Sequence, residues 1–248
     1  MEKIEKKNKK KTIKKIEKNS KKKRNTIKFS QEQINLIHGC LLGDSSLETQ
    51  RKDGKTWRLR FGHKAAHKAY TFSKYEKMKE FCGTRPRRSK RKDERTLKIY
   101  SKYTFSTLTF SELTEFADLY YGEKKNGRWI KHVPQNIVEI LNDEVLAYWF
   151  MDDGSLKERG KSNAVRLSTE GFLPEDVERL AKALEEKFNF SVSVLAVSKA
   201  KPWQKRITIL ESSYSNLAAR IGKYLHPCMY YKFPDGKKGI YKGSIINP

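Results

Sequence analysis

Two apolar segments that each end in an aspartate constrain the fold of this chain most. A helix capped by Ser30 is predicted to run to about Asp44, and a second helix spans Asp143–Asp153, so the two aspartates lie 109 residues apart. The second helix is apolar almost all round, which is typical of a buried helix. The same order of helix, strands, helix, strands and helix follows each start. The chain is therefore expected to contain two structural repeats of about a hundred residues each.

The local elements follow from the spacing of apolar residues. Alternation of apolar and polar residues predicts half-buried strands, whereas apolar residues every three or four positions predict helices. The predicted strands are Trp57–Gly62, Thr96–Lys102, Asn163–Thr169, Ser191–Val197 and Lys205–Leu210. The further predicted helices are Phe72–Cys82, Ser111–Tyr121, Pro174–Phe188 and Ser213–Tyr224. The segment Arg85–Lys92 is interpreted as a basic loop.

A carboxylate at the end of an apolar helix needs an explanation. The helix dipole and the free carbonyl groups make that end negative, which disfavours an anion there. A divalent cation bound by carboxylate and carbonyl oxygens would relieve both problems. If the two helices pack side by side, with Gly39 and Gly43 allowing close approach, both ends meet at one metal site. The alternative is that Asp44 and Asp153 are turn residues that only end their helices.

The charge of the chain points to a polyanionic partner. There are 54 Lys and Arg against 29 Asp and Glu, a net charge of +25, which favours nucleic acid. Residues 1–28 carry 14 Lys or Arg and 3 Glu with few apolar residues, so this segment is expected to be a disordered basic tail. Such a tail is either a nonspecific phosphate-binding arm or a solubility tail.

The cysteines and the apolar segments bear on the compartment. Three scattered cysteines form neither a disulfide framework nor a metal motif, which fits a reducing compartment. No apolar run is long enough to span a bilayer, so no membrane association is expected. The pair His63 and His67 has no third ligand at a suitable spacing, so no zinc site is expected there.

The two aspartate-ending segments resemble the motifs of a known family. Residues 146–154, with the sequence LAYWFMDDG, resemble the second motif of the single-chain, two-motif LAGLIDADG homing endonucleases, and residues 37–45 resemble the first motif more loosely. Residues 229–234, MYYKFP, resemble the C-terminal segment of the yeast mitochondrial intron-encoded member. The resemblance covers roughly residues 30–235.

The resemblance implies an α+β fold of two pseudo-symmetric αββαββα repeats. The two motif helices would form a central interface, and two saddle-shaped antiparallel sheets would straddle the DNA major groove. The expected divisions are the tail 1–28, the first repeat 29–136 and the second repeat 137–248. The implied activity is metal-dependent, site-specific cleavage of double-stranded DNA at a long non-palindromic site, in intron homing. A monomer with no obligate protein partner is expected.

The resemblance also assigns roles to individual residues. Asp44 and Asp153 would bind Mg²⁺, for which Mn²⁺ could substitute, and activate water, with Gly43 and Asp152 as further metal ligands. Asp152 competes with Asp153 for the catalytic role, and register with Asp44 favours Asp153. A lysine near each centre, Lys131 and Lys232, would assist catalysis; the alternative is that both lysines are ordinary phosphate contacts. Metal ions that bridge two carboxylates can activate water and neutralise charge during phosphodiester hydrolysis.

Basic residues that alternate with core residues predict the DNA-facing surface. Arg and Lys there either read guanine edges or hold phosphates. The predicted DNA-binding residues are Arg58, Arg60, Arg87, Arg88, Lys98, Lys102, Arg166, Lys205 and Arg206. The alternative is a solvated sheet face.

Two other functions remain open. One is an RNA-binding splicing maturase on the same fold, and the other is a plain DNA-binding regulator. The presence of both aspartates and both lysines favours the enzyme, because a binding module needs none of them. The lysine-rich composition and the habit of the family suggest an organelle, either mitochondrion or chloroplast, and otherwise the cytoplasm.

Overall fold

The computed structural model of the protein describes residues 28–233, which form two halves with the same element order. The first half contains α2 (Gln31–Leu42), β1 (Ser46–Glu48), β2 (Arg58–Lys64), α3 (Lys68–Met78), β3 (Arg87–Lys92), β4 (Ile99–Ser106) and α4 (Leu113–Tyr120). The second contains α6 (Asp143–Asp153), β7 (Gly154–Glu158), β8 (Ser162–Leu167), α7 (Pro174–Phe188), β9 (Val192–Ser198), β10 (Lys201–Ile209) and α8 (Tyr214–Ile221). Both halves therefore follow the order αββαββα. Most of the tail expected at residues 1–28 lies outside the described residues.

Short elements connect the halves and extend the helices. The hairpin β5 (Glu123–Lys125) and β6 (Arg128–Ile130) and the one-turn helix α5 (Ile137–Ile140) lie between the halves. The 3-10 helices are η1 (Ala65–His67), η2 (Lys79–Phe81), η3 (Glu211–Ser213), η4 (Gly222–Tyr224) and η5 (Pro227–Lys232).

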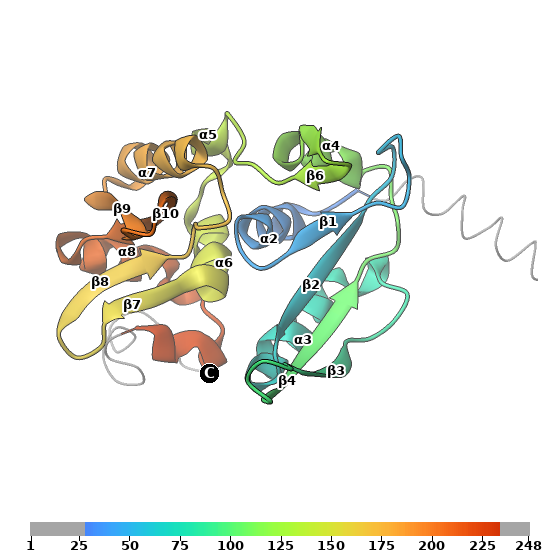
Figure 1. Ribbon diagram of the computed structural model, residues 1–248, viewed down its shortest axis with the longest axis horizontal. Helices are drawn as coiled ribbons and strands as arrows, with labels where there is room; N and C mark the ends of the chain where they lie inside the picture. Colours follow the sequence, from blue (N-terminus) through green and yellow to red (C-terminus); the bar gives the residue numbers. More distant parts are fainter. Residues whose placement is uncertain (1–27, 234–248) are drawn as a thin grey trace, which may run out of the picture.

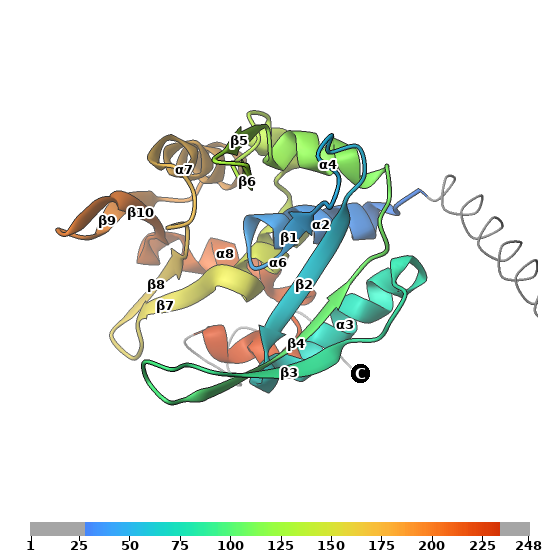
Figure 2. The ribbon, with the colours of Figure 1, turned by 45° about the vertical axis from the view of Figure 1, so that its right-hand side comes forward.

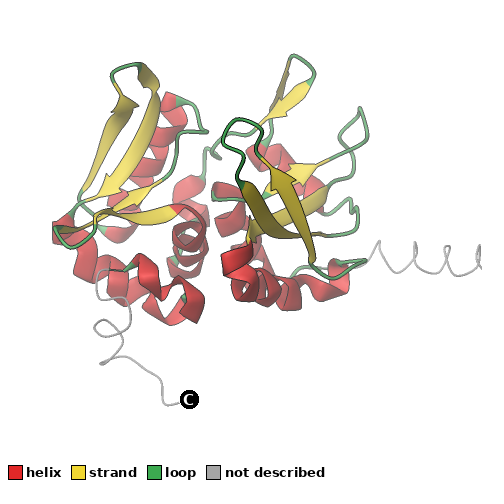
Figure 3. Ribbon diagram, turned by 60° about the horizontal axis from the view of Figure 1, so that its bottom comes forward, coloured by secondary structure: helices red, strands yellow, loops and turns green. Residues whose placement is uncertain are grey.

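Each half carries one four-stranded antiparallel sheet. The strand orders are β1-β2-β4-β3 and β7-β8-β10-β9, so each half pairs its strands in the same way. In the first half α3 packs against β2 and β4 (Figure 2). The two sheets lie on the same side of the central helices (Figure 3). This arrangement confirms the predicted α+β fold of two αββαββα repeats.

The central interface joins α2 to α6 (Figure 1). Ser30 begins α2 with a capping box, and the Asn142 side chain accepts hydrogen bonds from the amides of Glu144 and Val145, so a side chain caps the start of each helix. Val145 to Trp149 are buried, and the same hydrophobic core runs through both halves. The two helices thus act as the shared centre of one core.

Two parts of the strand prediction are wrong. The segment interpreted as a basic loop, Arg85–Lys92, contains strand β3, which pairs with β4. The predicted strand Thr96–Lys102 begins later, at Ile99, because the Asp93 carboxylate accepts hydrogen bonds from the amides of Arg95 and Thr96 and holds a turn there. An all-polar strand such as β3 has no apolar alternation, so its sequence does not show it.

None of the helices between residues 28 and 233 has both the length and the apolar character needed to cross a bilayer.

Candidate functional site

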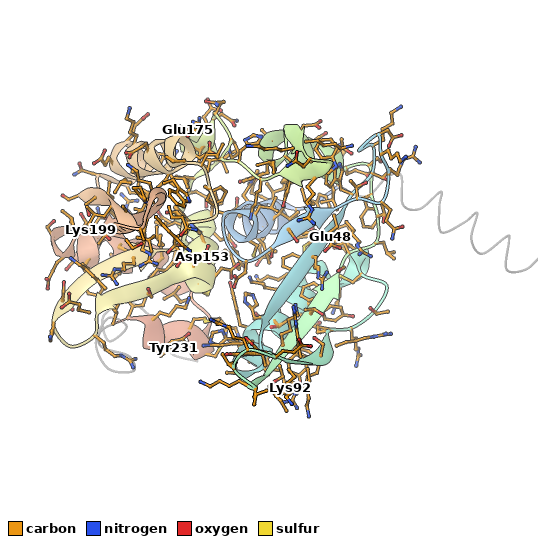
Figure 4. All side chains as sticks on the ribbon, in the orientation of Figure 1. Glu48, Lys92, Asp153, Glu175, Lys199 and Tyr231 are labelled. Carbon is orange, nitrogen blue, oxygen red and sulfur yellow. The ribbon has the colours of Figure 1, made fainter. Side chains whose placement is uncertain are left out.

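The two motif aspartates lie at the ends of the central helices, on the side that faces the sheets. Asp44 follows Gly43, the C-cap of α2, and Asp153 is the last residue of α6. Asp153 lies near the middle of the molecule, between the halves, whereas Lys92 and Lys199 lie toward its outer parts (Figure 4). The Asp44 side chain remains 47% exposed, so it is open to a ligand from solvent. The geometry brings the two predicted carboxylates to one place.

Two lysines satisfy the carbonyl groups at the same helix ends. The Lys131 ammonium donates to the carbonyl oxygens of Gly43 and Ser45, at 3.2 and 3.1 Å. The Lys232 ammonium donates to the carbonyl oxygens of Phe150, Met151 and Asp152, at 3.3, 2.6 and 3.1 Å. A cation at a helix C-terminus offsets the negative end of the dipole and pairs carbonyls that the helix leaves free. Both lysines therefore lie at the helix ends that carry the two aspartates.

The charges at the site change the acidity of its groups. Burial, together with the negative charges of Asp44 and Asp152, raises the pKa of Asp153 to about 8. Burial lowers the pKa of Lys131 and of Lys232 to about 8 in each case, and the neighbouring aspartate carboxylates raise it by a smaller amount. Perturbed acids and bases in one cluster are typical of a functional site.

Asp152 differs from Asp44 and Asp153 because both oxygens of its carboxylate already accept hydrogen bonds within the protein. Its side chain is 0% exposed. Its Oδ1 accepts hydrogen bonds from the Lys74 ammonium at 2.7 Å and from the Tyr70 hydroxyl at 3.0 Å, and its Oδ2 accepts one from the Asp44 amide at 3.3 Å. Burial raises the pKa of Asp152, but Lys74, His63 and the Tyr70 hydroxyl together lower it by more, so its pKa lies below the usual range. The Asp152 carboxylate thus acts as a buried partner of α3.

Lys74 and His63 were not predicted from the sequence as parts of the site. Lys74 is fully buried in α3, and its ammonium lies 3.0 Å from Nε2 of His63. Nδ1 of His63 lies 3.2 Å from Oδ2 of Asp44. His67, the other histidine of the predicted pair, instead contacts the Tyr231 hydroxyl at 3.0 Å. The two histidines therefore face different partners.

The donor set fits a hard divalent cation. One ligand atom each from Asp44, His63 and Asp152 lies within 4.8 Å of the others, but the Asp152 carboxylate already accepts hydrogen bonds from Lys74 and Tyr70. The carbonyl oxygens of Gly43 and Asp152 stand at corresponding positions, each beside one lysine, and each keeps a second lone pair. Burial and the nearby carboxylates of Asp44 and Asp152 raise the pKa of Asp153, and a bound cation would offset both effects. An acidic group able to hold a metal is therefore present.

A cavity of about 490 Å³ opens beside the helix ends. Its walls include Asp44, His63 and Asp152 from the acidic cluster, and Arg159 and Lys232 from the second half and the C-terminal segment. Carboxylates and cations thus meet at one open cavity, which suits an anionic substrate that needs both a metal and positive charge.

Four predicted DNA-binding residues share the open face of the first sheet. Leu59 and Phe61 of β2 are buried, so Arg58 and Arg60 point to the other side. Gly62, on the same side of β2 as the two arginines, pairs with Thr104 of β4, and Thr104 pairs with Arg87 of β3. Arg87 and Lys102 therefore lie on the same face as the arginines. Both β2 arginines bond the Glu48 carboxylate, Arg58 at 2.7 Å and Arg60 at 2.9 Å. This face is basic but contains one ordered acid.

The second sheet is less basic on the corresponding face. Arg166 lies opposite Thr208, so Arg166 and Arg206 share that face, and Arg206 forms an ion pair with Glu170. Lys205 points to the other face, where it pairs with Glu178 of α7 at 3.3 Å. Lys205 therefore does not belong to this face, contrary to the expectation.

Two further predicted contacts have other positions in the first half. Arg88 alternates with Arg87 and lies opposite Tyr103, on the helix-facing side of the sheet, where it bonds the Ser101 hydroxyl at 3.3 Å. Lys98 precedes β4, and its carbonyl accepts a hydrogen bond from the Asp93 amide in the turn between β3 and β4. Strand alternation places neither residue on the open face.

Comparisons with known proteins agree with this geometry. Residues 34–217 match the model of a family described as the LAGLIDADG DNA endonuclease family. The chain is 39% identical over 221 residues to DNA endonuclease I-ChuI of Chlamydomonas applanata, covering 86% of this chain and 99% of that protein. It is 28% identical over 206 residues to cytochrome b mRNA maturase bI2 of Debaryomyces hansenii, covering 82% and 74%.

A solved structure has the same arrangement of elements. It is the homing endonuclease I-WcaI bound to its DNA recognition sequence, with a TM-score of 0.73 and 26% sequence identity. The match covers 83% of this chain and 87% of that one. Sequence and fold therefore point to the same group of proteins.

Proposed function

The chain belongs to the LAGLIDADG DNA endonuclease family, and on that premise we propose that it cleaves double-stranded DNA at a long, non-palindromic site. The observation that carries the proposal is the convergence of Asp44 and Asp153 at the ends of two adjoining helices, each end bound by a buried or half-buried lysine. A protein that only binds DNA has no use for such a costly cluster of like charges.

Asp44 and Asp153 are proposed as the carboxylate ligands of Mg²⁺, with Mn²⁺ as a substitute. The main-chain oxygens of Gly43 and Asp152 are the proposed carbonyl ligands, because the Asp152 carboxylate is already bonded to Lys74 and Tyr70. When bound, the cation would polarise the scissile phosphodiester and lower the pKa of a water nucleophile. Magnesium suits oxygen ligands of this kind.

The chain's own residues supply orientation and charge. Lys131 and Lys232 bind the carbonyl groups at both helix ends, which fixes the backbone that carries the Asp44 and Asp153 carboxylates. Their ammonium groups also place positive charge beside the site of a developing phosphoryl anion, which stabilises that anion most where water is excluded. Lys232 is only 9% exposed, which provides such an environment.

The open faces of the two sheets are the proposed DNA surface. Arg58, Arg60, Arg87 and Lys102 in the first half, and Arg166 and Arg206 in the second, are the proposed contacts. Neutralising phosphates releases counterions, so affinity should fall steeply as salt concentration rises. Because the basic residues of the two faces differ, a non-palindromic site suits this surface.

The proposed site is complete within one chain. Both aspartates and both lysines belong to a single copy, and the α2–α6 contact is internal. A monomer can therefore present two catalytic acids to the two strands of DNA. We further propose an organellar intron, in a mitochondrion or chloroplast, as the origin of the gene, because relatives such as a probable intron-encoded endonuclease of Wickerhamomyces canadensis resemble it over 88% of the chain.

The decisive experiment uses conservative variants of the two aspartates. Asp44→Asn and Asp153→Asn should each abolish Mg²⁺-dependent double-strand cleavage of the intron-free insertion site and leave DNA binding in Ca²⁺ largely intact. Asp118→Asn, an exposed residue on α4, is the matched control and should cleave normally. If either motif variant still cuts both strands at the normal rate, the assigned roles are wrong.

A splicing maturase is the second candidate, favoured by the maturase relative. Its measurement is splicing of the host intron in the presence of the protein. Splicing that depends on the protein and survives both aspartate substitutions would support a maturase, since RNA binding needs no catalytic acid.

A further inference from the structure

We propose that His63 is a positioning residue for Asp44, and that Lys74 fixes the ring tautomer in which His63 does so. The inference rests on the proposed function for its catalytic consequence, although its structural core can be tested without DNA. It assigns a role in the site to two residues outside both motifs, and it makes the two catalytic acids unequal.

The contacts form one continuous chain between the halves of the molecule. Asp152 of α6 accepts a hydrogen bond from Lys74 of α3 at 2.7 Å, and the Lys74 ammonium lies 3.0 Å from Nε2 of His63 on β2. On the other side of the ring, Nδ1 lies 3.2 Å from Oδ2 of Asp44. Lys74 is 0% exposed and the His63 side chain 3% exposed, so water does not reach the contact between these two side chains.

The chemistry of the partners decides which ring nitrogen carries the proton. An ammonium group has only donors, so Nε2 beside Lys74 has to be the accepting nitrogen. In a singly protonated ring the proton then resides on Nδ1, the ring nitrogen that contacts the Asp44 carboxylate at 3.2 Å. The rival acceptor for an Nε2 proton, Oδ1 of Asp152, lies 3.6 Å from Nε2, beyond hydrogen-bond distance. Lys74 thus directs the donor of His63 toward Asp44.

Among residues 28–233, no histidine corresponding to His63 contacts the second acid, Asp153. Ser46 pairs with Arg60 in the first sheet, and Ser155 pairs with Arg166 in the second. His63 lies three residues after Arg60, and Thr169 lies three residues after Arg166, so Thr169 is the equivalent position in the second half. The Thr169 hydroxyl donates to the Lys205 carbonyl and not to an aspartate. His63 therefore orients one acid of the pair only.

Asp44 needs such a partner because its side chain is half exposed. An exposed carboxylate samples several rotamers, and fixing one on metal binding costs side-chain entropy. A partner on one oxygen of the Asp44 carboxylate fixes the orientation of the group and leaves the other oxygen available to a metal ion. Residues that contact metal ligands commonly act in this way. The contact between His63 and Asp44 thus prepares the carboxylate for its ligand.

The first test reads the tautomer directly. Long-range ¹H–¹⁵N NMR of the full-length, metal-free protein should show that the singly protonated His63 ring carries its proton on Nδ1. A His63→Gln sample assigns the resonance. A singly protonated ring with its proton on Nε2 would overturn the proposal. This result does not depend on whether the protein cleaves DNA, so it separates the inference from the proposed function.

The second test uses two amides that replace different halves of the ring. The amide of His63→Asn can place an N–H near the former Nδ1, whereas that of His63→Gln reaches toward the former Nε2. We expect His63→Asn to stay within about threefold of the native cleavage rate, and His63→Gln to lose about 10- to 100-fold. Both variants should bind the target DNA in Ca²⁺ with native affinity.

The pattern of strand cleavage adds a readout that a general structural defect would not produce. With strand-specific end labels, His63→Gln should slow one strand more than the other and accumulate nicked DNA. Equal losses for His63→Asn and His63→Gln, or equal slowing of both strands, would contradict the positioning role. If the native protein cuts no DNA under any metal, the proposed function fails, and the tautomer measurement still decides this inference.

Discussion

Gly39 faces Tyr148 across the α2–α6 interface so closely that a Cβ added to Gly39 would lie 2.5 Å from the Tyr148 Cβ. The same added atom would lie 2.5 Å from the Val145 carbonyl oxygen. Gly43 faces Asp152 in the same way, also at 2.5 Å from its Cβ. Each glycine therefore makes room for a larger residue at the corresponding position of the partner helix, 109 residues later.

Gly39→Ala should lower the free energy of unfolding by about 2 kcal/mol, since overpacking a rigid contact costs about 1–3 kcal/mol or more. The favourable helix propensity of alanine, about 1 kcal/mol, offsets only part of that cost. Chemical denaturation measures the change. Gly171→Ala is the control, because an added Cβ there meets nothing within 4 Å, and it should be neutral. Equal stability of both variants would show that the helices can separate without cost.

Lys232→Met should destabilise the protein even in the absence of DNA and metal. The substitution keeps the apolar stem but leaves the Phe150, Met151 and Asp152 carbonyls without their donor, which costs about 1–3 kcal/mol. Thermal unfolding measures the loss, and Lys182→Met on the exposed side of α7 is the control. Unchanged stability together with weaker DNA binding would instead mean an ordinary phosphate contact.

Glu48→Gln should change how the protein chooses DNA sequences more than how tightly it binds DNA in general. Glu48 fixes Arg58 and Arg60 in position and repels phosphates on the proposed DNA face. Its neutralisation should raise nonspecific affinity and relax preference at the base pairs under these arginines. Binding to a library of single-base variants measures both effects, with Glu186→Gln on α7 as the control. A preference profile identical to that of the native protein would contradict this role.

Stability should fall on the acid side because of a buried histidine. Burial lowers the pKa of His38 to about 4 from the ordinary 6.5, so the unfolded chain binds a proton between these values that the folded chain refuses. The free energy of unfolding should therefore decrease as pH falls through that window, by about 3 kcal/mol at most. His38→Gln should flatten the decrease in urea denaturation between pH 7 and pH 4. An unchanged slope would show that other groups cause the acid sensitivity.

The central helices and their acids could be predicted because their information is local. An apolar segment that ends in Asp44 or Asp153 shows its burial and its chemistry within a dozen residues, and glycines four apart indicate a close approach. The repeat order was likewise visible, since each half repeats the same periodicities. Lys131 and Lys232, to which the family resemblance assigned supporting roles, contact the carbonyl groups at these two helix ends.

Lys74 shows why the rest could not be predicted. The apolar pattern of its helix placed Phe72, Tyr75 and Met78 in the core, and a lysine there is expected to be solvated. The structure instead buries Tyr70, Lys74 and Met78, because the counter-charge for Lys74 comes from Asp152, 78 residues away in the other half. A buried charge pair of this kind depends on tertiary contacts, which local periodicity does not contain.

The unequal contact at Gly39–Tyr148 and Gly43–Asp152 has a consequence for any attempt to rebuild the protein from one half. Two copies of the first half would set glycine against glycine and leave a hollow seam. Two copies of the second would force tyrosine against tyrosine and carboxylate against carboxylate. Neither half can pair with a second copy of itself. Hybrids assembled with halves of related proteins should therefore fold only when a glycine on one central helix faces the larger residue on the other.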